Sequence, residues 1–194
     1  KFGAGGDRPR KIEKLVAELI GEEKASRFWT SFRKHYITEA DIKRIAELGF
    51  NSVRPALNSR LFLTEGNNPV YVEEGFLLLD SLISWCRKHH LYVAAYDLLN
   101  EPLPVGTGAA AKYKHLLVPL YKRLTAAIRN IDTRHMITLE GFDWSNDWSL
   151  FDKPIDDNVF YQFHYYCWAR PDLMGGIDKF IKKRAELNTP IWVG

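Results

Sequence analysis

The residues able to do chemistry in this sequence follow four segments whose composition is typical of β-strands. They are Arg54, the run Asn100-Glu101-Pro102, the pair Glu140-Gly141 and the run His164-Tyr165-Tyr166. A carboxyl group and an imidazole can transfer protons, while an amide and a guanidinium can orient a substrate or hold a charge. In a barrel of parallel strands the carboxyl-terminal ends meet on one face, where active sites lie. The spacing therefore predicts one site assembled from several strand ends.

The segments that must position these residues alternate between strand and helix patterns. Strands are predicted over 50–55, 91–99, 136–139, 159–163 and 190–193. Helical apolar spacing covers 12–20, 28–32, 42–48, 78–86, 120–128 and 177–181. The long apolar run 91–99 is typical of a sheet that is covered on both faces. This alternation predicts βαβ units, a parallel sheet and a single α/β domain over residues 1–194.

Helix boundaries are marked by recognisable residues. Gly21 is expected to stop the first helix, and Thr38 with Asp41 forms a capping-box pattern at the start of the third. Gly49 then occupies the position where a left-handed residue ends a helix. Pro119 suits the first turn of the helix that follows it.

Composition places the chain among globular proteins and excludes several functions. The 194 residues are 46% hydrophobic and carry a net charge of +3, and a complete (β/α)₈ barrel needs about 250 residues. No apolar run suits a membrane helix, and the basic stretch 179–184 predicts a solvated helix face rather than a nucleic-acid site. Cys86 and Cys167 are expected to be buried free thiols. Neither has a partner at metal-ligand spacing, so no metal or cofactor is expected.

Four strand ends together resemble glycoside hydrolase family 5. The run Tyr96-Asp97-Leu98-Leu99-Asn100-Glu101-Pro102 is similar to the Asn-Glu-Pro signature of that family, at the end of its fourth barrel strand. Arg54 resembles the arginine of the second strand, and His164-Tyr165-Tyr166 resembles the His-x-Tyr of the sixth. Residues 190–194 resemble the seventh strand. The resemblance spans nearly the whole chain and implies a truncated (β/α)₈ TIM-barrel fold.

The resemblance implies retaining hydrolysis of a β-linked glucan by two carboxyl groups about 5–5.5 Å apart. Glu101 would be the acid/base, and it must be protonated before it can donate to the glycosidic oxygen. Asn100 would hydrogen-bond the sugar 2-hydroxyl, and His164 would orient the acid/base or a substrate hydroxyl. Arg54 would keep the nucleophile ionised, and Tyr166 would hydrogen-bond to it.

Each of these residues also has a purely structural interpretation. Arg54 could be an ion-pair partner, and a lone strand-end histidine is usually satisfied by its neighbours. Trp144 and Trp148 could stack on sugar rings or pack the loop that carries them. Glu140 is expected to be a site-rim or structural carboxylate, and Asp97 is expected to anchor structure.

The resemblance also implies that parts of the family domain are absent. The first and eighth strands have no counterpart, and the nucleophilic glutamate is expected just beyond Gly194. A βα unit with a histidine-bearing loop is missing between Val93 and Ala94. About five of eight strands remain, which would leave the barrel open and sheet edges exposed. The chain as it stands is therefore expected to have little or no hydrolytic activity.

The expected substrate is a polysaccharide or oligosaccharide, with cellulose-type β-1,4-glucan ahead of β-1,3-glucan and mannan. Two alternatives remain open, a non-catalytic carbohydrate-binding remnant and a fragment that does not fold stably. No nucleic acid or membrane is expected as a partner, and the protein is expected to be a monomer. Family members are commonly secreted, which implies an extracellular or periplasmic location.

Overall fold

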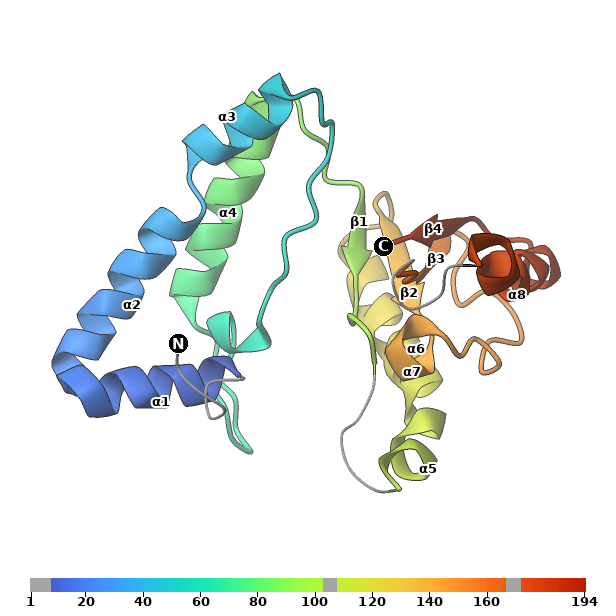
Figure 1. Ribbon diagram of the computed structural model, residues 1–194, viewed down its shortest axis with the longest axis horizontal. Coiled ribbons are helices and arrows are strands. Elements are labelled where there is room, and N and C mark those ends of the chain that lie inside the picture. Colours follow the sequence, from blue (N-terminus) through green and yellow to red (C-terminus); the bar gives the residue numbers. More distant parts are fainter. Residues whose placement is uncertain (1–7, 103–107, 167–171) are drawn as a thin grey trace. The chain divides into compact units, whose positions relative to one another are not determined.

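The computed structural model describes residues 8–102, 108–166 and 172–194, and Cys167 lies outside them. The chain divides into two compact units, Lys1–Val93 and Ala94–Gly194 (Figure 1). The division falls between Val93 and Ala94, where the sequence predicts an absent βα unit.

The described part of the first unit is mostly helical. It contains α1 (Pro9–Ile20), α2 (Glu22–Tyr36), α3 (Glu39–Glu47), the 3-10 turn η2 (Ser59–Leu61) and α4 (Glu73–Lys88). Gly21 has a φ of 84° and separates α1 from α2, as predicted. The capping box is confirmed, because Asp41 Oδ2 accepts the Thr38 backbone N–H at 2.8 Å. Gly49 has a φ of 89° after α3, the left-handed conformation expected of it.

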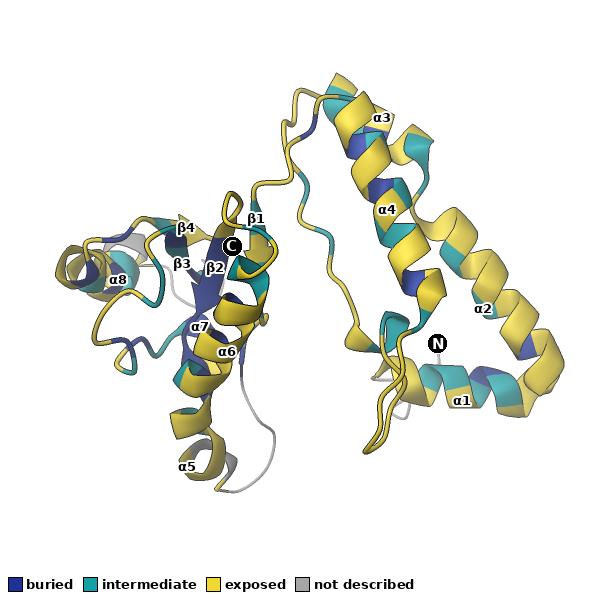
Figure 2. Ribbon diagram, turned by 180° about the vertical axis from the view of Figure 1, so that it is seen from behind, coloured by how far each residue is buried: buried dark blue, intermediate teal, exposed yellow. Residues whose placement is uncertain are grey.

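Helices α3 and α4 pack through a small apolar cluster. Ile42, Leu82, Cys86 and Leu91 are buried there, and Figure 2 shows dark blue at separate positions on the two otherwise more exposed helices. Cys86 is a buried free thiol, as predicted, and its burial raises the pKa of the thiol because the thiolate would lose its hydration.

The strand predicted over 50–55 does not form. Only an isolated parallel bridge joins Ser52 to Tyr92, supported by the Tyr92 N–H donating to the Asn51 carbonyl at 2.8 Å. A parallel strand needs successive ladder hydrogen bonds to an extended neighbour. Here the neighbouring segment supplies a single bridge, so the local strand preference is not realised.

The second unit contains a parallel sheet with helices between its strands. Its elements are β1 (Ala95–Asp97), α5 (Ala109–Tyr113), the 3-10 turn η3 (Lys114–Leu116), α6 (Leu117–Arg129), β2 (Met136–Glu140), α7 (Phe142–Ser145), β3 (Val159–Phe163), α8 (Leu173–Leu187) and β4 (Ile191–Val193). The strand order is β1-β2-β3-β4 and every pairing is parallel. The βαβ prediction and the last three strands are thus confirmed, and Pro119 lies in the first turn of α6.

The prediction for the run 91–99 is wrong in length and burial. Only Ala95–Asp97 is a strand, and Tyr92 is 69% exposed. Within the described residues β1 pairs with β2 alone, so its other edge carries no ladder. An apolar run forms a long buried strand only where neighbours cover it on both sides. The described sheet accordingly has four strands rather than the five expected.

Residues alternate between the two faces of this sheet because side chains along a strand point to opposite sides. One face packs against α6 and α8 and forms the core, which contains Ile137, Leu139, Tyr161 and Phe163 together with Tyr121 and Phe180. The neighbours of these residues along β2 and β3 are polar and include Thr138, Glu140 and Gln162. The register pairs Glu140 with Gln162. The fold therefore brings a carboxylate and an amide together on the face opposite the core.

Trp148 belongs to this core. It is buried, its ring centroid lies 5.0 Å from that of Phe180 and 5.6 Å from that of Tyr161, and its Nε1 donates to the Ser145 carbonyl at 3.1 Å. Of its two sequence-based interpretations, packing is the one that holds. The same hydrogen bond anchors the loop that follows β2.

One buried polar group on β2 has no hydrogen-bond partner among the described residues, the Thr138 hydroxyl. A desolvated hydroxyl without a partner costs about 1–3 kcal/mol. Replacing Thr138 by the isosteric valine is therefore expected to stabilise the second unit by about 1 kcal/mol. Urea unfolding of the two proteins measures the difference, and a loss of stability in the valine variant would show that the hydroxyl has an unrecognised partner.

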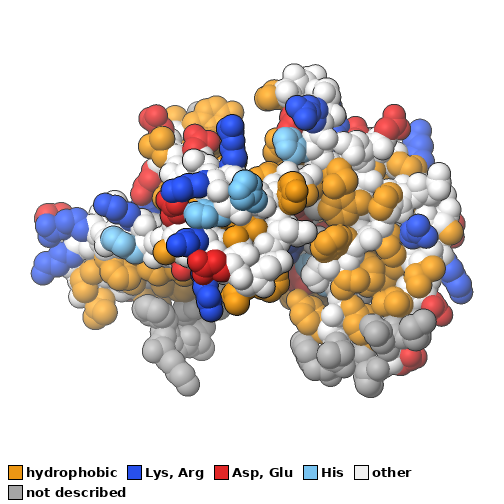
Figure 3. All heavy atoms as spheres, turned by 90° about the horizontal axis from the view of Figure 1, so that it is seen from above, with side chains coloured by type: hydrophobic (Ala, Val, Ile, Leu, Met, Phe, Trp, Pro, Cys, Tyr) orange, Lys and Arg blue, Asp and Glu red, His pale blue; other side chains and the backbone are white. Residues whose placement is uncertain are grey.

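Large hydrophobic side chains remain exposed on the second unit. In Figure 3 hydrophobic side chains gather over the right-hand part of the surface. The edge strand β4 contributes Trp192 and Val193, and β1 contributes Tyr96. Uncovered edges of this kind are expected for a parallel sheet with too few strands to close.

Among the described residues, no helix combines the length and apolar content that crossing a membrane requires.

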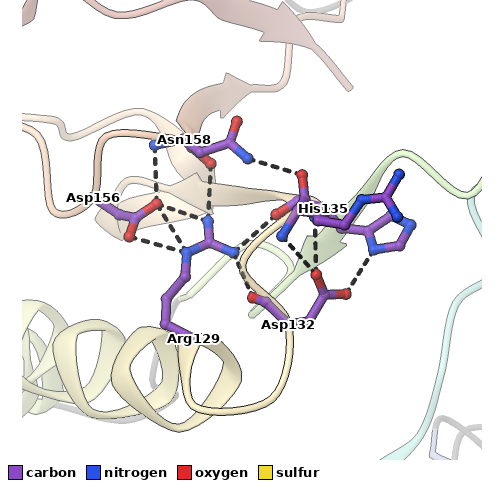
Figure 4. A network of polar contacts seen from close by, with 6 residues as sticks. Arg129, Asp132, His135, Asp156 and Asn158 are labelled. Atoms are coloured by element: carbon purple, nitrogen blue, oxygen red, sulfur yellow. Dashed lines mark hydrogen bonds and ion pairs between the residues drawn. The ribbon is translucent and has the colours of Figure 1, made fainter.

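Arg129, the last residue of α6, forms hydrogen bonds to the loops that lead into β2 and β3 (Figure 4). Its Nε and Nη2 donate to Asp156 at 2.7–3.1 Å, and its Nη1 donates to the Asp132 and His135 carbonyls at 3.1 and 2.9 Å. Nη2 also reaches the Asn158 carbonyl at 3.2 Å. One planar guanidinium thereby satisfies several loop carbonyls and a carboxylate, which only arginine has the donors to do.

Candidate active site

Glu101 lies on a tight turn directly after β1. Its φ is 45°, a conformation that non-glycine residues adopt at a cost of about 1–3 kcal/mol and that occurs often at functional sites. The turn is held by the Glu101 backbone N–H, which donates to Glu140 Oε2 at 2.7 Å. The loop after β2 adds a second tie, because the Asp143 N–H donates to the Pro102 carbonyl at 3.1 Å.

The structure brings His164 to Glu101, although the two are 63 residues apart in sequence. His164 follows β3, is 8% exposed, and places Nδ1 at 2.6 Å from Glu101 Oε1. The distance is that of a short, charge-assisted hydrogen bond. Both residues follow the carboxyl ends of parallel strands, and the sequence pattern predicted that they would meet there.

Behind this pair lies a buried polar network that sequence reasoning did not assemble. Glu140 is 0% exposed, so its interpretation as a rim residue is wrong and the structural one holds. Gln162 Nε2 donates to Glu140 Oε1 at 2.7 Å and lies 3.2 Å from His164 Nε2. Gln162 Nε2 also lies 3.4 Å from Asp97 Oδ2, which fits the expected anchoring role of Asp97. Gln162 was not among the site residues predicted from the sequence. A glutamine inside the apolar run 159–163 nevertheless indicates a buried polar contact.

The Gln162 side chain packs closely against one glycine, and a second glycine directly after β2 packs closely against the loop that follows it. A Cβ on Gly194 would lie 2.6 Å from the Gln162 amide carbon, so the Gln162 side chain would have to shift to admit any other residue there. A Cβ on Gly141 would lie 2.3 Å from the Trp148 ring and 2.6 Å from the Asp147 carbonyl oxygen. Both glycines therefore allow a close approach that keeps the network compact.

An open cavity of about 670 Å³ adjoins Glu101. It is lined by Leu99, Asn100, Glu101, Pro102, Tyr113, Leu116, Leu117, Pro119, Leu120, Arg123 and Phe142. Most of these residues are apolar, and the few polar groups are concentrated at Asn100, Glu101 and Arg123. Mostly apolar walls with a few convergent polar groups are the usual make-up of a small-molecule site.

Trp144 stands on an unusual turn after β2. Asp143, Trp144 and Ser145 all have positive φ, at 56°, 56° and 63°. The Ser145 hydroxyl donates to the Gln162 carbonyl at 2.6 Å and holds the end of the turn. Trp144 itself is 54% exposed. The turn therefore presents a large aromatic ring to solvent, directly after Asp143 and its hydrogen bond to Pro102.

The remaining predicted site residues lie apart from this cluster or at its margin. Asn100 is exposed and lines the cavity beside Glu101. Tyr166 is exposed, two residues after His164. Arg54 is exposed and belongs to the first unit, whereas Glu101 and His164 belong to the second. The structure thus assembles Glu101 with His164 and Asn100.

A parallel sheet with an imidazole and a carboxyl group at the ends of its strands places this chain among α/β proteins of the barrel type. A solved structure supports that class, the Thermotoga maritima Cel5A mutant in complex with cellobiose. The two share a TM-score of 0.64 at 16% sequence identity, covering 81% of this chain and 70% of Cel5A. The likeness shows a (β/α)₈ TIM-barrel type of fold, truncated in this chain.

The family model described as Cellulase (glycosyl hydrolase family 5) matches residues 92–194, which is more than half of the chain. This chain therefore belongs to glycoside hydrolase family 5, whose members are glycosidases. A β-xylosidase of Phanerodontia chrysosporium is 26% identical over 211 residues, and endoglucanase C of Acetivibrio thermocellus is 38% identical over 56 residues.

The chain spans less than half of the length of these two relatives, 43% of the β-xylosidase and 16% of the endoglucanase. The longer alignment covers 80% of this chain, or about 155 of its 194 residues. About 55 of its 211 positions therefore have no residue of this chain opposite them. This coverage fits an incomplete copy of the family domain.

Proposed function

We propose that the second unit carries the acid/base half of a retaining glycosidase site that cleaves β-linked glucan, with Glu101 as the acid/base. The observation that carries the proposal is the 2.6 Å contact between Glu101 and His164 beside an open cavity. A histidine that donates to Oε1 at that distance can orient the carboxyl group in both its carboxylate and its carboxylic acid form, because the proton of the acid can lie on Oε2. Both forms are needed in the two halves of a retaining reaction.

Asn100, Arg54 and Tyr166 complete the proposed site. Asn100 lines the same cavity as Glu101 and would hydrogen-bond the sugar 2-hydroxyl. Arg54 and Tyr166 would hold the nucleophile, for which family resemblance points to a glutamate encoded after Gly194. Glu140 is not the nucleophile in this proposal, because a carboxylate with no exposed surface cannot reach a sugar carbon. Both units would then belong to one partial catalytic domain over residues 1–194.

The proposal is tested with the protein encoded by the complete gene, acting on cello-oligosaccharides. Proton NMR follows the anomeric signal of the newly formed reducing end. Early appearance of the β-anomer is expected, because two displacements at the anomeric carbon retain configuration. Early formation of the α-anomer, or no hydrolysis of any soluble β-1,4-glucan, β-1,3-glucan or mannan, would contradict the proposal. The ranking of substrates in the same assay decides between β-1,4-glucan and the other two.

Trp144 is proposed to stack on a sugar ring, because its strained turn exposes it next to the loop of Glu101. Replacing Trp144 by alanine is expected to weaken cello-oligosaccharide binding about 5- to 30-fold, which corresponds to a stacking energy of about 1–2 kcal/mol. Isothermal titration of the complete protein measures the effect. Tyr36→Ala is the control, since Tyr36 is also an exposed aromatic residue but lies at the end of α2 in the first unit.

The second candidate function is binding of carbohydrate without hydrolysis, and exposed Trp144 together with the cavity favours it. Binding of cello-oligosaccharides by a protein that releases no reducing sugar would select this alternative. In either case the proposed partner is a polysaccharide or oligosaccharide, and the proposed state is a monomer. An extracellular or periplasmic location is proposed from the family alone.

A further inference from the structure

The carboxylate of Glu140 is a fully buried ionisable group in contact with Glu101. It lies at the end of β2 with 0% of its surface exposed. A buried carboxylate costs several kcal/mol unless hydrogen bonds replace its water. Two N–H groups do so here, the backbone N–H of Glu101 on Oε2 and the amide of Gln162 on Oε1, both at 2.7 Å.

The contact with Glu140 fixes the orientation of the Gln162 amide. An ionised carboxylate only accepts hydrogen bonds, so Gln162 must turn its NH₂ group, not its carbonyl oxygen, toward Glu140. The side chain has little freedom to move away, because the backbone of Gly194 packs against it. The same nitrogen, Gln162 Nε2, lies 3.2 Å from His164 Nε2.

This orientation in turn decides which ring nitrogen of His164 carries the proton. An NH₂ group is a donor only, and its contact with His164 Nε2 at 3.2 Å is shorter than the 3.3 Å from that nitrogen to Glu140 Oε1, so His164 Nε2 is assigned as the acceptor from Gln162. A neutral imidazole has one protonated nitrogen, and the proton is therefore on Nδ1. Nδ1 is the atom that lies 2.6 Å from Glu101 Oε1. The proton is thus directed at the proposed acid/base.

We propose that Glu140 is a positioning residue that holds Glu101 in two ways. It accepts a hydrogen bond from the Glu101 backbone N–H, and it acts on the Glu101 side chain through a relay of two residues, Gln162 and His164. The relay keeps His164 in the Nδ1–H tautomer, and the backbone bond keeps Glu101 in its left-handed conformation. The effect of these contacts on catalysis rests on the proposed function of Glu101 as the acid/base. The tautomer itself is a property of the folded chain and can be measured without substrate.

Two substitutions are expected to move the proton of His164 in the same direction. In Glu140→Gln the new amide keeps its oxygen on the Glu101 N–H and turns its NH₂ group toward Gln162. Gln162 must then present its oxygen, to which His164 Nε2 can only donate. In Gln162→Met the donor is removed, and His164 Nε2 is free to donate to Glu140 Oε1, which lies 3.3 Å away. Both variants are expected to have the proton on Nε2.

The experiment is long-range ¹H–¹⁵N NMR of the 194-residue chain labelled in its histidine rings, at a pH where His164 is neutral. The His164 signals are assigned from their loss in His164→Gln. The expected result is a protonated Nδ1 in the unmodified chain and a protonated Nε2 in both variants. Thr138→Val is the control, because it alters a buried polar side chain on the same strand and should leave the tautomer unchanged.

A protonated Nε2 in the unmodified chain would overturn the proposal, as would a proton that stays on Nδ1 in either folded variant. Gln162→Met keeps the test decisive if Glu140→Gln does not fold. In the complete gene product, Glu140→Gln is expected to lower kcat by up to about 10²-fold with little change in KM, because it misplaces the proposed acid/base. Loss of all hydrolysis in the unmodified protein would count against the proposed function only, because the tautomer measurement does not depend on turnover.

Discussion

Replacing Glu101 by glutamine is expected to lower kcat of the complete gene product on soluble β-glucan by about 10²- to 10⁴-fold, the usual contribution of general acid–base catalysis. Glutamine keeps the size and the backbone conformation of the side chain but cannot give a proton to the glycosidic oxygen. The His164 contact at 2.6 Å would be retained as a hydrogen bond to the amide oxygen. A reducing-sugar assay measures the loss.

The dependence on the leaving group separates this role from simple damage to the site. A β-glycoside of 2,4-dinitrophenol needs no protonation to depart, so its cleavage should fall far less in Glu101→Gln. Added azide should then restore turnover, because a small anion can attack the glycosyl-enzyme intermediate without a general base. Equal losses on both substrates, with no rescue by azide, would rule Glu101 out as the acid/base. Glu186→Gln, at an exposed glutamate on α8, is the matched control.

Replacing Arg129 by methionine is expected to destabilise the second unit by about 2–3 kcal/mol, somewhat below the 3–5 kcal/mol typical of a fully buried ion pair. The variant leaves Asp156 without its guanidinium partner and removes donors from several loop carbonyls (Figure 4). Hydrogen exchange of the β2 and β3 amides measures the change locally. Arg134→Met is the control, since the Arg134 side chain lies in the same loop but is exposed.

The effect of Arg129→Met is also expected to depend on pH. The hydrogen bonds from Arg129 hold the pKa of Asp156 below its ordinary value of 3.8. A carboxyl whose pKa is lowered by folding stabilises the protein above its unfolded pKa, and this stability is lost as the pH falls toward the folded pKa. The difference in stability between the two proteins should therefore be largest at neutral pH and shrink as the pH falls below about 4, leaving the part that comes from the loop carbonyls. A difference that is constant down to pH 2 would mean that the Asp156 pair contributes little.

The sequence by itself determined most of the local structure. The capping box at Thr38 and the left-handed Gly49 depend on contacts within a few residues, and both are present. The apolar spacing of α6 and α8 likewise reports one buried face of each helix. Asn100-Glu101-Pro102 and His164 could be placed at strand ends for the same reason, because a strand and the residue after it are adjacent in the chain.

Tertiary structure alone decided which of the segments with strand composition form strands. The segment 50–55 and the run 91–99 have strand composition, yet the first forms one bridge and the second forms three strand residues. A strand depends on the neighbour that completes its ladder, and strand composition does not say whether that neighbour is present.

Tertiary structure also decided the surroundings of Glu101. The register of β2 against β3 pairs Glu140 with Gln162, and that pairing places a buried carboxylate behind Glu101 and His164. No spacing in the sequence indicates it, because the two residues lie 22 positions apart and meet only through the parallel ladder. The sequence determined that Glu101 stands just after a strand, where we propose it as the acid/base. The packing of three strands determined which hydrogen bonds hold it there, since hydrogen bonds form between atoms that are close in space.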